Sequence, residues 1–249
     1  MPRFFVEPDK IRDGQIVIDT EDVAHIKKVL RIREGEVITV CDSCGNDYQA
    51  EVIEIAEKQV LCNILSSAHS ETEPNISVTL FQGLPKAAKM DYIIQKTTEL
   101  GIVRIVPCAL SRCVVKLENQ KAEEKKVSRW QKIAEEAAKQ SGRGVIPKIS
   151  MPVTLAEAIR ELQNMDLAFV PYECEEMTSL KKVLTGQKDV CNIGFLIGPE
   201  GGFDPAEIEK ITAAGIKTVT LGKRILRTET AGEAVLAMTM YELGDINTF

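Results

Sequence analysis

The stretch Ile193–Glu207, which reads Ile-Gly-Phe-Leu-Ile-Gly-Pro-Glu-Gly-Gly-Phe-Asp-Pro-Ala-Glu, decides the fold of this chain. Its first five residues are apolar, as is typical of a buried strand. Asp204 and Glu207 have the spacing of a capping box around Pro205, so the pattern predicts a helix start. The loop between strand and helix, Gly198–Gly202, has few side chains, and a ligand there can reach backbone N–H groups. Ligands of open α/β sheets bind at such carboxyl ends of strands.

A second junction of the same kind lies shortly downstream. Thr218–Leu221 is predicted as a strand that ends at Gly222, and the spacing of Thr230 and Glu233 suggests a capping box. Two such junctions in close succession indicate that both loops meet over one ligand. The helix that follows has an apolar face at a period of about 3.6 residues. This face consists of Ala234, Val235, Met238 and Tyr241.

The composition is that of an ordinary globular protein. The 249 residues are 44% hydrophobic and 27% charged, which fits one large or two modest domains. No signal peptide is evident at Met1–Glu7, and no apolar run reaches the roughly 18 residues of a membrane span. The seven cysteines are scattered, as expected of reduced thiols. We therefore expect a cytoplasmic protein without a membrane segment.

Cys41 and Cys44 form a C-x-x-C pair, which can be half of a zinc site, a redox pair or the tip of a hairpin. Cys108 and Cys113 do not have the spacing of a second pair, and no histidine lies near them. The flanking residues have the pattern of two strands and a turn. The sequence therefore predicts a hairpin tip here, and no metal site elsewhere in the chain.

The chain is expected to form two domains. Residues 1–72 are predicted as a small β-barrel with strands at 15–18, 37–41, 48–55 and 60–64 and a helix at 22–30. Residues 66–75 are polar and are predicted as a linker. Residues 73–249 alternate strands with helices, which indicates an α/β domain with a mostly parallel sheet.

Several chemistries find no support. His25 and His69 are the only histidines and precede the α/β part, which disfavours a Ser-His-Asp triad. No Walker lysine follows a glycine loop, and no G-x-G-x-x-G opens the first strand–helix unit. The net charge of −6 argues against a generally basic nucleic-acid protein. Cations nevertheless cluster before residue 34 and between residues 112 and 143, so local nucleic-acid binding stays open beside a merely solvated surface.

Six segments of the chain together carry a specific resemblance. They are His25–Arg31, Gly83–Asp91, Ile94–Gly101, Arg129–Ala137 with Gln140–Arg143, Ile197–Gly202 and Leu221–Ala231. In this order they resemble the RsmE-type 16S ribosomal RNA uridine-N3 methyltransferases of the SPOUT superfamily, and the resemblance covers essentially the whole chain. It implies an N-terminal PUA-like barrel and a C-terminal α/β domain with a trefoil knot. It also implies S-adenosylmethionine as cofactor, a homodimer, and 16S rRNA or the small ribosomal subunit as substrate.

The resemblance also assigns residues to roles. A cofactor site is implied at Leu196, Ile197, Gly198, Pro199, Glu200, Gly201, Leu221, Gly222, Ile225, Leu226, Arg227 and Thr230, with a weaker match at Val170–Tyr172. The catalytic candidates are Arg227 and Arg112, as cations for a uracil carbonyl or a phosphate, and Glu99 and Glu229, as proton acceptors. The RNA-binding candidates are Arg3, His25, Lys28, Arg31, Arg33, Lys86, Lys89 and Arg143.

Two other functions remain in view. The Gly-Pro-Glu-Gly-Gly loop also suits an enzyme that binds a phosphate of another small ligand. A protein that binds RNA through its barrel without catalysis would carry the same cation clusters. Binding of S-adenosylhomocysteine against nucleotides separates the first alternative from a methyltransferase, and a methyl-transfer assay separates the second.

Overall fold

The computed structural model describes residues 3–86 and 88–246 of the chain. The chain divides into two compact units, one of Met1–Glu73 with Ala138–Ile146 and one of Pro74–Ala137 with Pro147–Phe249. The domain boundary between residues 72 and 73 stays a prediction.

The first unit contains a six-stranded sheet with the strand order β1-β4-β5-β6-β3-β2. All its neighbouring strands are antiparallel except β1 and β4. The strands expected at 15–18 and 37–41 are confirmed, whereas the linker expected from residue 66 is wrong, since β6 continues to His69 opposite β5. The strands are β1 (Arg3–Phe5), β2 (Ile11–Arg12), β3 (Gln15–Ile18), β4 (Val37–Cys41), β5 (Asn46–Ile55) and β6 (Val60–His69).

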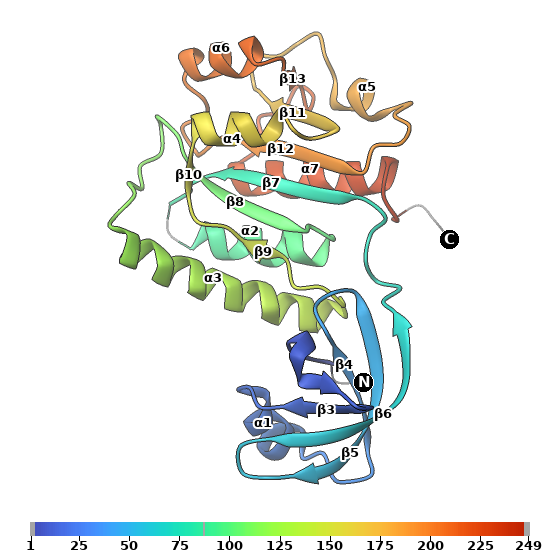
Figure 1. Cartoon of the computed structure of the whole chain (residues 1–249). Coiled ribbons are helices and arrows are strands. Elements are labelled where there is room, and N and C mark those ends of the chain that lie inside the picture. The colour runs from blue at the N-terminus through green and yellow to red at the C-terminus, as the bar shows by residue number, and fades with distance from the viewer. Residues whose placement is uncertain (1–2, 87, 247–249) are drawn as a thin grey trace. The chain divides into compact units, whose positions relative to one another are not determined.

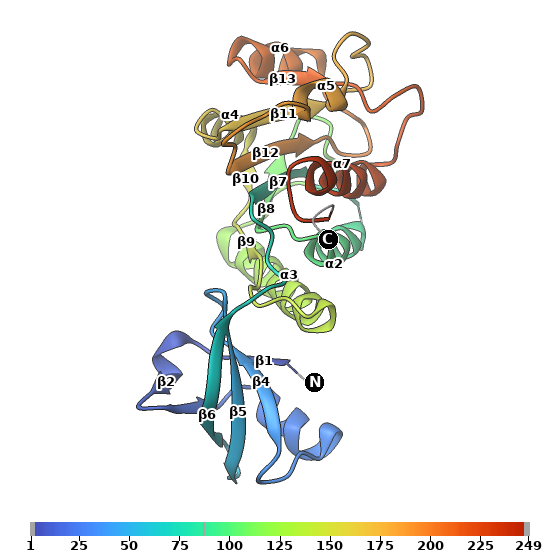
Figure 2. The same ribbon diagram turned by 90° about the vertical axis from the view of Figure 1, so that its right-hand side faces the viewer.

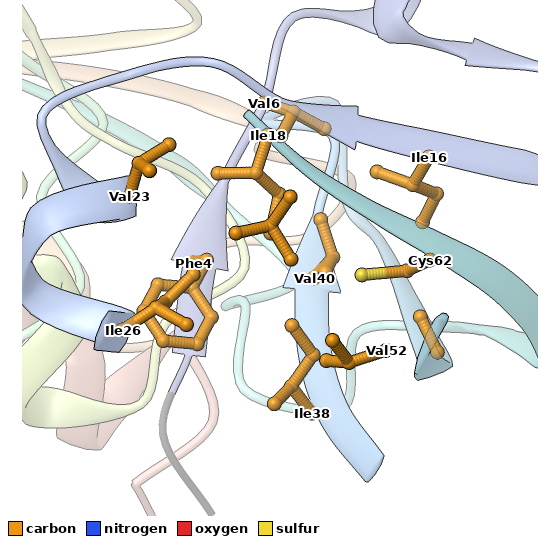
Figure 3. Packing of buried hydrophobic residues seen from close by; sticks show 12 residues of the cluster. Phe4, Val6, Ile16, Ile18, Val23, Ile26, Ile38, Val40, Val52 and Cys62 are labelled. Atoms are coloured by element: carbon orange, nitrogen blue, oxygen red, sulfur yellow. The ribbon is translucent and has the colours of Figure 1, made fainter. Parts of the chain in front are cut away.

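Alternate residues of these strands build the core of this unit. Ile16 and Ile18 of β3 and Ile38 and Val40 of β4 are almost fully buried, while their neighbours in sequence point the other way. Figure 3 shows their side chains converging with Phe4 and with residues of β5 and β6. The period of two thus explains why these short segments are strands around one apolar interior.

The helix expected at 22–30 is present in a modified form. It starts as α1 (Asp22–Ala24) and continues as the π-helix η2 (His25–Leu30), after which Arg31 has a φ of 54°. Val23 and Ile26 anchor it in the core, and Ile32 N donates to Ile26 O at 3.1 Å to close the wide turn. The short 3-10 helix η1 (Pro8–Lys10) precedes β2.

The hairpin expected around Cys41 and Cys44 is confirmed. Asp42 accepts hydrogen bonds from the backbone N–H groups of Cys44 and Asn46, and Gly45 takes a φ of 94° to complete the turn between β4 and β5. Burial raises the pKa of the Cys41 thiol to about 12. Within the described ranges, no group of three or more His, Cys, Asp or Glu side chains is arranged to hold a metal ion.

The second unit contains a parallel sheet with the order β10-β8-β7-β12-β11-β13, and β9 pairs with β8. The central strands are apolar and buried on both faces, as parallel sheets require. The strands are β7 (Ser77–Gly83), β8 (Arg104–Ala109), β9 (Lys148–Ile149), β10 (Val153–Thr154), β11 (Leu167–Pro171), β12 (Asn192–Ile197) and β13 (Lys217–Val219).

Helices cover this sheet. Figures 1 and 2 show α2 and α7 together on one side of the sheet and α4 on the other. No helix in the described part of the chain is both long and apolar enough to cross a membrane. The helices are α2 (Lys89–Glu99), α3 (Gln120–Ser141), α4 (Leu155–Leu162), α5 (Leu180–Leu184), α6 (Pro205–Ala213) and α7 (Thr228–Glu242).

The two predicted helix starts have different outcomes. The capping box of Asp204 and Glu207 is confirmed at the start of α6. The one expected from Thr230 is wrong, because α7 already begins at Thr228 with Arg227 as its N-cap. Glu233 is instead engaged by the hydroxyl of Tyr92, at 3.3 Å.

Candidate active site

The candidate site lies where three neighbouring strands end. From β7 the chain continues to β8 on one side of β7, whereas β12 lies on the other side of β7 and is followed in the sheet by β11 and then β13. Connections that leave in opposite directions open a crevice at the carboxyl ends of the strands. The loops that meet there follow β11, β12 and β13; local patterns predicted the last two, and the family resemblance implied the first at Val170–Tyr172.

A cavity of 670 Å³ lies between the loops after β11 and β13. Leu221, Gly222, Ile225 and Leu226, all predicted as cofactor residues, line it. Ile225 is 86% exposed, which is unusual for an isoleucine and leaves its side chain available to a ligand. The other lining residues are Pro171, Tyr172, Glu173, Glu175, Glu176, Thr220, Lys223, Arg224 and Ala231.

The predicted residues of the β12 loop support the site without lining this cavity. Leu196 and Ile197 are buried in the strand, and Pro199 is buried directly after it. A Cβ on Gly83 would lie 2.7 Å from Pro199 N, so the end of β7 touches the backbone of this loop. A Cβ on Gly201 would lie 3.1 Å from Arg112 Cβ. Glycines at both positions therefore allow close packing of the loop.

Glu200 ties the same loop to the start of α2. Lys86 N donates to Glu200 Oε1 at 3.0 Å, and Lys89 Nζ lies 3.2 Å from the same atom and 3.2 Å from Glu229 Oε2. Burial opposes the charge of Glu200, but these hydrogen bonds outweigh it and lower its pKa. The hydrogen bond to Glu229, followed by that to Glu200, raises the pKa of Lys89. The four residues therefore form a charged cluster at the head of α2 and α7.

The catalytic candidates differ in whether their side chains already have hydrogen-bond or ion-pair partners. Arg227 is exposed, and its guanidinium makes no ion pair or hydrogen bond with the described residues. Arg112 donates to Gly201 O at 3.1 Å and lies 3.7 Å from Asp204. Glu99 pairs with Lys96 at 2.9 Å. It lies ten positions after Lys89, about 15 Å along α2, so the fold does not bring it to the cluster.

The RNA-binding candidates fall into exposed and engaged groups. His25, Lys28, Arg31 and Arg33 are exposed along the turn that contains η2. Three others have structural partners in this chain. Arg3 pairs with Asp47 at 2.9 Å, Lys89 belongs to the cluster above, and Arg143 is 3% exposed and pairs with Glu73 at 2.6 Å. Lys86 is exposed, and so is Thr230, a cofactor candidate that does not line the cavity.

Sequence reasoning missed the acidic wall of the cavity. Glu175 accepts from Met177 N at 2.8 Å, Thr178 N at 2.9 Å and the hydroxyl of Thr218, which lowers its pKa, with the Thr218 hydroxyl as the largest cause. It thereby fixes the loop that carries Glu173 and Glu176. The signal was present in the sequence, since three glutamates fall within the four residues Glu173–Glu176, shortly after β11.

Comparison with known proteins identifies the family. The family model described as an RNA methyltransferase domain matches residues 72–240. The chain belongs to the RNA methyltransferase family. The model described as an RNA methyltransferase PUA domain matches residues 18–65. The expected SPOUT-type fold with an N-terminal PUA-like barrel is thus confirmed.

Individual relatives of the family align along the whole chain. "Ribosomal RNA small subunit methyltransferase E" of Bacillus subtilis (strain 168) is 34% identical over 249 residues, covering 97% of each chain. The structure of the protein of the same name from Neisseria gonorrhoeae, bound to S-adenosyl methionine, has a TM-score of 0.86 at 30% identity and covers 99% of both chains. A methyltransferase from Legionella pneumophila, also with this cofactor, has a TM-score of 0.86 at 29% identity, covering 98% of both chains. The resemblance to RsmE-type enzymes is confirmed.

Proposed function

We propose that this RNA methyltransferase transfers a methyl group from S-adenosylmethionine to N3 of a uridine in 16S ribosomal RNA. The observation that carries the proposal is the 670 Å³ cavity between the loops after β11 and β13. It lies at the strand ends where the sequence motifs predicted a cofactor. Relatives similar over the whole chain are named as ribosomal RNA small subunit methyltransferases, and two solved structures hold this cofactor.

The residues around the cavity fit such a cofactor. Leu221, Ile225 and Leu226 offer apolar surface for an adenine ring, and the backbone at Gly222 offers polar groups without a side chain. Glu173 and Glu176 bring negative charge to the rim, which suits a cationic sulfonium and an ammonium group. The cofactor supplies an electrophilic methyl group when bound.

The chain contributes orientation and electrostatics. N3 of uracil becomes a nucleophile only when its proton leaves, and negative charge then develops on the flanking carbonyl oxygens. Arg227 ends the loop that lines the cavity and has a free guanidinium, so we assign it to one of these oxygens. Glu229 is already engaged by Lys89, which makes it a weaker candidate for the proton acceptor.

Substrate binding is assigned to the exposed cations of the first unit. They are His25 and Lys28 of η2 and Arg31 and Arg33 just after it, and none of the four makes an ion pair with the described residues. Phosphate contacts of this kind supply affinity that falls with salt. Since the substrate is ribosomal RNA, we place the enzyme in the cytoplasm.

We also propose that the enzyme is a homodimer. Tyr92 of α2 and Met238 and Tyr241 of α7 are 43%, 41% and 60% exposed, and these two helices pack against each other. A second copy related by a two-fold axis would cover this apolar surface. Sedimentation is expected to show a dimer at assay concentration, and an active monomer would refute this part of the proposal.

A methyl-transfer assay tests the activity. Tritiated S-adenosylmethionine is incubated with small ribosomal subunits or with free 16S rRNA, and the labelled base is mapped. We expect label on N3 of one uridine. Absence of transfer despite tight RNA binding would favour a non-catalytic binding protein. Calorimetric binding of nucleotides but not of S-adenosylhomocysteine would favour a different small-ligand enzyme.

A further inference from the structure

Gln82 is a polar residue in a fully buried position. It is 0% exposed near the end of β7, where its neighbours are apolar. Its Nε2 donates to Thr228 Oγ1 at 2.9 Å and to Gly83 O at 3.0 Å. Thr228 follows 146 residues later in the chain. A buried amide is costly without hydrogen bonds, so these contacts fix the position of both side chains.

Thr228 in turn connects Gln82 to the loop after β12 at the candidate cofactor site. Its hydroxyl donates to Gly198 O at 2.6 Å, and Thr228 is itself only 6% exposed. Because a hydroxyl has one proton, the bond to Gly198 leaves its oxygen to accept from Gln82. The three residues form a directed relay, which we call the Gln82 relay, from Gln82 through Thr228 to Gly198.

The Gln82 relay joins two loops of the site, those after β12 and β13. Gly198 is the first residue of the loop after β12, and Thr228 directly follows Arg227, the last residue of the loop after β13. We propose that Gln82 and Thr228 are positioning residues that set the distance between these loops for cofactor binding. This inference rests on the proposed function, since it names residues that organise the same site.

Stability alone does not explain a glutamine at this position. Among residues 3–86 and 88–246, no group donates a hydrogen bond to Gln82 Oε1, although the atom is buried. Gly232 of α7 faces this oxygen, and an added Cβ there would lie 3.6 Å from it. An apolar side chain of similar volume would leave no such unpaired acceptor. The glutamine is explained by the bond that its Nε2 makes to Thr228.

Substitutions at Thr228 separate positioning from packing. Thr228→Val keeps the shape but removes the hydroxyl, and Thr228→Ser restores it. Thr239→Val is the matched control, because Thr239 is also in α7, is 0% exposed, and donates to Val235 O at 2.8 Å within the helix. Gln82→Met breaks the relay at its other end with little change in volume.

The readouts are the Kd of S-adenosylhomocysteine by calorimetry and the Tm of the free protein. We expect Thr228→Val and Gln82→Met to raise the Kd about tenfold, or about 1.4 kcal/mol, and the double variant to add little more. Thr228→Ser should bind like the wild type. Thr239→Val should lower the Tm about as much as Thr228→Val does, but it should leave the Kd unchanged.

Three outcomes would overturn the inference. One is a wild-type Kd in folded Thr228→Val and Gln82→Met. Another is an equal loss of affinity in Thr239→Val, which would show a general effect of stability. A wild-type protein that does not bind S-adenosylhomocysteine would refute the relay and the proposed function together. Binding without methyl transfer would refute the proposed function alone.

Discussion

The loops after β12 and β13 meet at one site but are held very differently. The β12 loop is fixed at four points, through Gly198 to Thr228, Pro199 to Gly83, Glu200 to the start of α2, and Gly201 to Arg112. The loop after β13 exposes Lys223, Arg224, Ile225 and Arg227. Rigid groups pre-organise a site, whereas an open loop can close on a ligand. We therefore expect the first loop to support cofactor affinity by holding the site in place, and the second to contact the cofactor and, through Arg227, the substrate.

The largest effect is expected for Arg227→Ala. Loss of a cation that stabilises a developing oxyanion typically lowers kcat by about 100-fold or more, while RNA affinity should hardly change. Single-turnover methyl transfer and RNA binding are measured in parallel. Lys217→Ala, an exposed lysine of β13, is the control. A lower RNA affinity with an unchanged kcat would contradict this, because it would show that Arg227 binds RNA and takes no part in the chemical step.

The next effect is expected for Gly201→Val. A Cβ at this position would lie 3.1 Å from Arg112 Cβ, and the branched side chain must displace either Arg112 or the loop. We expect the affinity for S-adenosylhomocysteine to fall at least about tenfold, or about 1.4 kcal/mol, in a folded protein. Gly201→Ala should have a smaller effect. Unchanged binding by the valine variant would remove the β12 loop from the determinants of affinity.

The same contrast between engaged and free groups occurs in the first unit, where Arg143 is paired with Glu73 and Arg31 is exposed. Arg31→Ala should weaken RNA binding and reduce the slope of log K against log salt by about 0.7 for single-stranded RNA or about 0.9 for a duplex-like site. The kcat at saturating RNA should stay unchanged. Lys58→Ala, in the turn between β5 and β6, is the control. An unchanged salt slope would exclude a phosphate contact at Arg31.

The smallest effect is expected for Glu200→Gln, which removes one of the two negative partners of Lys89. The pair is partly exposed, so the loss of stability should stay below about 1 kcal/mol. The pKa of Glu200 is lowered by folding from its ordinary value of 4.5. Its contribution is therefore complete above pH 4.5 and is lost as the pH falls through the lower folded pKa. The Tm of the variant should therefore lie below that of the wild type above pH 4.5, and this difference should shrink as the pH falls. A difference that grows in acid would contradict this.

Local patterns predicted the parts of the fold that depend on neighbouring residues. The capping box at Asp204 and the strand Val37–Cys41 follow from spacing and alternation within a few positions. The family motifs likewise located Leu221 and Ile225 at the cavity. These features depend on residues that are close in the sequence.

Features that depend on distant partners were missed. Ser66–His69 are polar and exposed, yet backbone pairing with β5 keeps them in a strand. The start of α7 lies two residues earlier than its expected cap, where Thr228 bonds to Gly198. Gln82 gave no signal because a polar residue in a strand is predicted as exposed, and its partner lies 146 residues away. The charge on Arg143 suggested RNA, but Glu73 engages it within the first unit.

The composition of the first unit has a consequence for the order in which the protein matures. Its members include Ala138–Ile146, and Phe5 and Cys41 share a small apolar cluster with Ala138 and Ile146. The ion pair of Glu73 also forms only when Arg143 has been made. During synthesis from the N-terminus, the six strands emerge before these partners exist, so this unit becomes complete only after 64 of the 167 residues of the second unit have been made. A nascent chain that stops after residue 73 would present an uncovered apolar patch and an unpaired carboxylate.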